Sequence, residues 1–185
     1  MLLLAGSSVR GLPVVTVRGG EDVAEIKDIV YQADAGRIEG FTLNKRGLFT
    51  GKRREVLPTE QVHAIGADAV MILDEECLRE PGQAPPAVGA PERKRNVIGN
   101  DVLTEGGTSL GEVRDVVLLV GSSGEVVGYQ ITRPSGDDAY IPLPAQLAIS
   151  GTALVVPDET EQFTRDDLVG LGAAVEEFRA RHGVR

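Results

Sequence analysis

Apolar and polar residues alternate in short stretches along most of the chain, which is the pattern of half-buried β-strands. Such stretches cover 14–17, 26–31 and 38–43, and the apolar run 69–73 reads as a closing strand. The apolar residues 1–5 are too few for the core of a signal peptide and lack a basic start, so we expect a first strand there. Strands this short, separated by glycine-rich turns, predict small antiparallel barrels or sandwiches.

The pattern occurs twice. Three segments of the first half return in the second: 25–30 as 112–117, 36–41 as 124–129, and 57–58 as 141–142. The offsets are 87, 88 and 84 residues, so the repeat carries small insertions and deletions, as loops do. Two copies of one small unit predict two domains. We name them module one (1–77) and module two (96–158).

The segments outside the repeat differ in character. Residues 78–95 hold four prolines in eighteen positions, which predicts an extended linker. The tail 159–185 shows the only clear helical spacing. Its expected helix has an N-cap at Thr164 and a stop at Gly183. The apolar stripe of this helix is formed by Leu168, Leu171, Val175 and Phe178. We expect the stripe to pack on a barrel; the alternative is a docking helix for a partner or a second copy.

These residues resemble the PRC-barrel family, the small β-barrel shared by the cytoplasmic part of the photosynthetic reaction-centre H subunit and the C-terminal domain of the ribosome maturation factor RimM. The family pattern Gly-x-Val-x-Asp followed by two apolar residues stands at 111–117, and at 24–30 with Ala24 in place of the glycine. A Gly-x-apolar-x-Gly hairpin and an apolar-Pro step follow in both modules. The resemblance implies an all-β fold of two barrels in tandem plus one C-terminal helix. It also implies an interaction module rather than an enzyme, although neither relative's specific role transfers.

Charge and cysteine content limit the binding partners and the cellular compartments that are expected for this protein. The net charge is −9, and module two has two basic residues against eight acidic ones, so binding of nucleic acid along the whole chain is disfavoured. Cys77 is the only cysteine, which excludes an intramolecular disulfide and favours a reducing compartment. No apolar run approaches the ~20 residues that span a bilayer. We therefore expect a cytoplasmic protein.

The candidates for chemistry are few. His63, His182 and Cys77 are far apart in the sequence, so we expect no metal and no cofactor. The acid pairs Glu25/Asp28 and Glu112/Asp115 occur in both copies, which favours a structural role, with each aspartate accepting backbone N–H groups. No catalytic residues are predicted.

One basic patch breaks the acidic background and is the candidate binding site. It lies on a predicted hairpin of module one and consists of Lys45, Arg46, Phe49, Lys52, Arg53 and Arg54. The corresponding hairpin of module two is acidic, so the fold alone does not require the charge. The patch is either a solvated tip or a site for an anionic partner, to which 93–95 of the linker would add three more basic residues.

The leading hypothesis is a non-enzymatic scaffold or adaptor that binds a protein partner or itself. Contact between the basic patch of one molecule and module two of another is one form of self-association. The alternatives are an RNA- or ribosome-associated assembly factor and an accessory protein of a membrane or photosynthetic complex.

Overall fold

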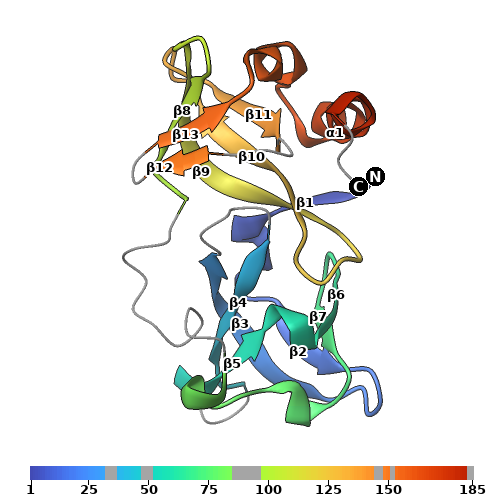
Figure 1. The fold of residues 1–185 in the computed structure, drawn as a ribbon. Helices are drawn as coiled ribbons and strands as arrows, with labels where there is room; N and C mark the ends of the chain where they lie inside the picture. The colour runs from blue at the N-terminus through green and yellow to red at the C-terminus, as the bar shows by residue number, and fades with distance from the viewer. Residues whose placement is uncertain (32–36, 47–51, 85–96, 144–147, 151–152, 183–185) are drawn as a thin grey trace.

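The computed structural model describes residues 1–31, 37–46, 52–84, 97–143, 148–150 and 153–182. Its strands form two sheets, one built mainly from each module (Figure 1). The sheet of module one contains β2 (Pro13–Thr16), β3 (Asp22–Tyr31), β4 (Ile38–Asn44), β5 (Lys52–Pro58), β6 (Val62–Ile65) and β7 (Val70–Ile72). The sheet of module two contains β8 (Asp101–Thr104), β9 (Ser109–Leu119), β10 (Val126–Thr132), β11 (Asp138–Pro142), β12 (Ala148–Ser150) and β13 (Ala153–Val156).

The two sheets have the same topology. Their strand orders are β5-β4-β3-β2-β7-β6 and β11-β10-β9-β8-β13-β12. The β2–β7 and β8–β13 pairs are parallel, and the other neighbours are antiparallel. The predicted all-β fold with two barrel-like copies and one C-terminal helix is therefore confirmed. Residues that hold the same register position in the two sheets are called equivalent below.

A shared glycine shows why the repeat keeps its pattern. Gly40 on β4 and Gly128 on β10 are equivalent, and each lies against the next strand of its sheet. A Cβ atom on either would stand 2.4 Å from a carbonyl oxygen, that of Leu57 or of Ile141. Because no side chain fits at that distance, the second glycine of the hairpin motif is required by the close approach of two strands.

The structural repeat is longer than the sequence similarity. In module one, β5 is joined at its free edge by a β-bridge between Val56 and Arg79, and in module two Tyr140 of β11 forms the equivalent bridge with Arg165. A 3₁₀ helix precedes each arginine: η3 (Glu75–Cys77) or η6 (Asp158–Phe163). These bridges cover edges that would otherwise offer unpaired backbone groups.

The first strand forms, but its partner lies in the other module. β1 (Leu3–Ala5) is antiparallel to β9, with Leu4 opposite Leu118. Figure 1 shows β1 beside β9 and close to α1, away from the rest of module one. The chain then turns through the 3₁₀ helix η1 (Gly6–Val9) before entering β2. Alternation indicates that a segment is a strand, but it does not indicate which edge the strand joins.

The two modules pack directly against each other. One hydrophobic cluster contains buried side chains of both, including Ile29 and Val116. Backbone hydrogen bonds also cross between them: the Ile65 N–H donates to the Ser122 carbonyl at 2.8 Å, and the Gly121 N–H donates to the Ile65 carbonyl at 2.9 Å. The turn between β9 and β10 therefore closes the edge of β6.

Helix α1 (Leu168–His182) packs on module two, as expected for its apolar stripe. Leu171 and Val175 are buried against Val117 and Val127. The expected start of the helix was wrong. Thr164 is the C-cap of η6. The helix begins at Leu168, after Asp167, whose carboxylate accepts the Gly170 N–H at 2.6 Å. The expected stop at Gly183 lies outside the described residues.

Threonine and aspartate are both good N-caps, and the sequence offered both within four residues. The β-bridge of Arg165 with β11 holds the chain extended at that point, so only Asp167 is free to cap. In the linker, Pro81–Gln83 forms the 3₁₀ helix η4, and residues 85–96 lie outside the described part. Within the described residues, no helix combines the length and apolar composition needed to cross a membrane.

Candidate partner-binding site

The predicted basic patch lies where β4 ends and β5 begins. Lys45 and Arg46 follow β4, and pairing of Asn44 with Lys52 brings Arg53 and Arg54 to the same end of the sheet. Phe49 lies outside the described residues. The described residues of the patch therefore lie together at one end of module one, on the two sides of the β4–β5 connection.

Two arginines of the patch are already paired within the molecule. Arg46 forms ion pairs with Asp22 and, at 3.7 Å, with Glu25. Arg53 contacts the carboxylates of Glu55 at 3.3 Å and Glu75 at 2.6 Å. Carboxylates of the same module therefore offset much of the positive charge.

The titration of Arg53 and Glu55 reflects this pairing. Burial alone would lower the pKa of Arg53, but the hydrogen bond and charge of Glu75, together with Glu55, raise it above its usual value. The pKa of Glu55 is lowered, first by a hydrogen bond from its own backbone N–H and also by Arg53. Lys45 and Arg54 are exposed and have no ion pair among the described residues. Whether the patch binds a partner stays a prediction.

The duplicated aspartates accept backbone N–H groups, as their occurrence in both copies predicted. Asp115 is 7% exposed and accepts the Ser7 N–H and the Val116 N–H, both at 2.8 Å. Asp28 accepts the Ile29 N–H at 2.9 Å and forms an ion pair with Arg10 at 2.8 Å. Asp115 thus fastens η1 to module two.

Tyr31, at the end of β3, lies in the field of these aspartates. Burial is the main reason that the pKa of Tyr31 is raised to about 12, and the negative charges of Asp115 and Asp28 raise it further. Arg10 opposes the shift. Tyr31 therefore reports on the junction between the modules.

The other residues considered for chemistry lie apart. His63 is exposed on β6, His182 is the last residue of α1, and the Cys77 thiol is buried in η3. Within the described part of the chain, no group of three or more histidine, cysteine or carboxylate side chains is placed to hold a metal ion.

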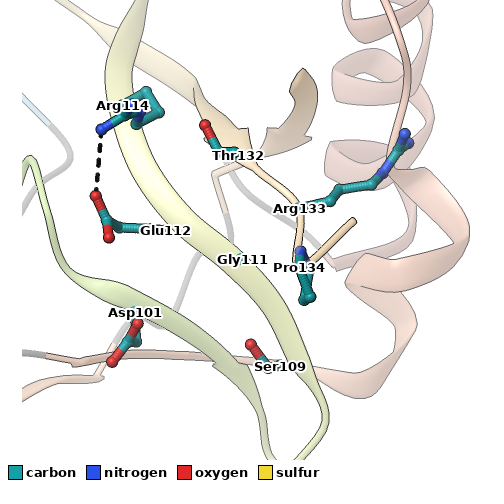
Figure 2. A pocket seen from close by; sticks show the side chains of 8 residues that line it. All are labelled: Asp101, Ser109, Gly111, Glu112, Arg114, Thr132, Arg133 and Pro134. Carbon is teal, nitrogen blue, oxygen red and sulfur yellow. Dashed lines mark hydrogen bonds and ion pairs between the residues drawn. The ribbon is translucent and has the colours of Figure 1, made fainter. Parts of the chain in front are cut away.

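A groove of about 380 Å³ lies on module two at the end of β8, β9 and β10 (Figure 2). Its lining residues are Asp101, Ser109, Gly111, Glu112, Arg114, Thr132, Arg133 and Pro134. Figure 2 shows Asp101 and Glu112 projecting from neighbouring strands, with Arg133 directed away from them. Arg133 pairs instead with Asp166 at 2.7 Å. Sequence reasoning did not identify this groove.

An apolar strip lies on the outer face of module one, where β2 and β7 run side by side. Val15 pairs with Met71, and the ladder continues to Val17 and Leu73 through hydrogen bonds to the carbonyls of Ile72 and Leu73. We call Val15, Val17, Met71 and Leu73 the β2–β7 strip. Val17 is 48% exposed and Leu73 is 41% exposed. Sequence reasoning missed the strip because outward positions could not be told from inward ones without knowing that β2 neighbours β7.

The fold and these surfaces define a protein built from two fused small β-barrels, with surface features that differ between the copies. The family model for the PRC-barrel domain matches residues 1–76 and 92–162, so the chain belongs to the PRC-barrel family. No curated protein matches the chain.

Proposed function

We propose that this protein is a non-enzymatic interaction module of the cytoplasm that presents the β2–β7 strip to a protein partner. The strip is the observation that carries the proposal. Four apolar side chains, from β2 and β7 and from the residue that follows each strand, lie on one outer face, and two of them are more than two fifths exposed. Contiguous apolar surface on a folded domain is typical of interaction sites.

The comparison between the modules supports a specific role for the strip. On module two, the equivalents of Val15 and Met71 are Leu103 and Val155, which also pair with each other. The equivalent of Val17 is Glu105, whose N–H donates to the Val156 carbonyl just as that of Val17 donates to Ile72. Module two therefore interrupts the same face with an exposed charge. Because the fold tolerates a carboxylate there, the fold does not require Val17 to be apolar.

A partner with an apolar face fits this strip better than nucleic acid does. The flanking ion pair of Arg18 with Asp74, at 2.8 Å, leaves the rim polar but without excess positive charge. An apolar centre with a polar rim is the usual anatomy of a protein–protein interface. The ribosome-associated and membrane-accessory hypotheses stay predictions, since no described contact favours either.

The test compares affinity purification of the tagged protein and two variants from its native cells, with quantitative mass spectrometry. We expect Val17→Glu/Leu73→Glu to lose the co-purifying partner because two buried carboxylates would oppose the contact. Val169→Glu is the control for introducing a glutamate at an exposed valine, since Val169 is 86% exposed on α1. Equal retention of partners by both variants would refute the role of the strip.

Two further readouts separate the alternatives. Ribosomal proteins that disappear after nuclease treatment would support the RNA-linked hypothesis instead. Catalytic turnover abolished by replacing a single carboxylate would contradict the non-enzymatic part of the proposal. Unfolding temperatures of all variants should match, because exposed substitutions usually change the unfolding free energy by no more than about 0.5 kcal/mol.

A further inference from the structure

The groove of module two has an equivalent in module one, and there an arginine fills it. In both modules the strand next to β2 or β8 carries a glutamate: Glu25 on β3 and Glu112 on β9. Glu25 pairs across the sheet with Asn44, and Glu112 pairs with Thr132. Two residues after Asn44, module one has Arg46, which forms ion pairs with Glu25 and Asp22.

Module two lacks this arginine. The equivalent of Arg46 is Pro134, which has no nitrogen donor, and the space is the groove of about 380 Å³. The equivalent of Asp22 is Ser109, since Asp22 pairs with Val15 and Ser109 pairs with Leu103. Module two therefore keeps the glutamate of the site but not the cation that the same position holds in module one.

A second carboxylate compensates for the loss of Asp22. Asp101 on β8 is directly opposite Glu112, where module one has Pro13 opposite Glu25. Two like charges directly opposite each other on antiparallel strands are destabilising unless a cation lies between them. Within the described part of the chain, the ion pair of Glu112 is a long contact with Arg114 at 3.4 Å, between side chains that are both about half exposed. Asp101 has no ion pair among the described residues.

We infer that this groove binds the guanidinium group of an arginine from a protein partner, held between Asp101 and Glu112 as Arg46 is held between Asp22 and Glu25. A planar guanidinium suits the site better than an ammonium because it can donate to two carboxylates at once. The site lies on the other module from the β2–β7 strip, and it does not depend on the function proposed for that strip.

The probe is an acetylated and amidated tripeptide of glycine, arginine and glycine, titrated into the ¹⁵N-labelled protein and followed by two-dimensional NMR. We expect saturable shifts of the backbone amides around Asp101, Gly111 and Glu112. The lysine tripeptide should bind more weakly. The citrulline tripeptide, which has the shape of arginine without its charge, should produce no saturable shift.

Three variants locate the binding. Glu112→Gln should weaken the arginine tripeptide about tenfold, the effect of removing one hydrogen bond to a charged group. Pro134→Arg should abolish binding, because it restores the internal arginine of module one and fills the groove. Glu105→Gln removes the same charge from an exposed turn of the same module, so binding should be unchanged.

Two results would overturn the inference. One is arginine binding that survives both Glu112→Gln and Pro134→Arg. The other is a set of shifts spread over the acidic surface and weakened equally by Glu105→Gln and Glu112→Gln, which would show attraction to the net charge of module two. The NMR spectra of the free variants report directly whether each is folded.

Discussion

Arg37 and Glu125 are equivalent residues of the two modules, and their backbones form an antiparallel β-bridge with each other. Equivalent residues meet in this way when a local twofold axis passes between them. Ile29 and Val116, another equivalent pair, share one hydrophobic cluster, and both approach the position that a Cβ atom on Gly6 would take, at 3.2 Å and 2.6 Å. The two barrels are therefore arranged like the subunits of a symmetric dimer, joined into one chain.

The side chains of these two residues also show where the symmetry ends. Arg37 donates to the Ser123 hydroxyl at 3.1 Å, whereas Glu125 pairs with Arg179 of α1 at 2.6 Å. Among the described residues, module two alone carries a long helix after its closing bridge, and Arg179 of that helix pairs with Glu125. The helix thus gives the two copies different surfaces.

Gly6 should be sensitive to any side chain. A Cβ atom there would stand 2.6 Å from Cγ2 of Val116 and 2.8 Å from Oδ1 of Asp115. We expect Gly6→Ala to lower the free energy of unfolding by about 1–3 kcal/mol, because the modules must separate slightly to admit the methyl group. Denaturant unfolding measures the change. Gly82→Ala is the control, since nothing lies within 4 Å of a Cβ there, and equal effects at the two sites would contradict the prediction.

Tyr31 should make the protein less stable at high pH. Its pKa is raised from 10.0 to about 12 in the folded protein, mainly by burial. The folded state therefore retains the phenolic proton that the unfolded chain loses, so this stabilisation is complete below pH 10 and declines as the pH rises towards 12. The decline is at most about 1.4 kcal/mol per pH unit.

The measurement is the free energy of unfolding between pH 9 and 12 for the wild type and Tyr31→Phe. The variant should show the shallower decline, since it lacks this phenol but keeps every other titrating group. Identical slopes would mean that Tyr31 ionises equally easily in both states.

Phe178 should anchor α1. Its side chain is completely buried, and its ring meets that of Phe163 edge to face, with centroids 5.1 Å apart. We expect Phe178→Ala to cost about 3–5 kcal/mol of unfolding free energy, as large-to-small changes in a packed core do. Val169→Ala, on the exposed side of the same helix, should have almost no effect. Comparable small losses at both positions would instead indicate a helix whose apolar stripe is free for a partner.

Much of the fold could be predicted from the sequence because the same local patterns occur twice. Alternation indicated the strands, glycine-rich segments indicated the turns between them, and the spacing from Leu168 to Phe178 indicated the helix. The N-cap at Thr164 was wrong because the bridge of Arg165 with β11, a tertiary contact, competes for that part of the chain.

The candidate site was less predictable. The sequence identified a basic patch by its charge, but it could not reveal that two of the arginines are paired within the molecule. Arg46 forms ion pairs with Asp22 and Glu25, and Arg53 forms ion pairs with Glu55 and Glu75. Ion pairs between strands depend on the register in which the strands pair. A bulge shifts that register by one residue, and the sequence does not show where the bulges lie. The groove and the strip were missed for the same reason, since each joins side chains of strands that are distant in the sequence.

By itself, the sequence determined that this protein has two copies of one small β-unit, because strand alternation, turn glycines and helical spacing are local properties of the chain. Only the tertiary structure decided that β1 joins β9, that the copies meet through the bridge between Arg37 and Glu125, and that module two leaves open the position that Arg46 fills in module one. Those features depend on which edges and faces come together, and burial of apolar surface over the whole molecule selects among the pairings that local patterns allow.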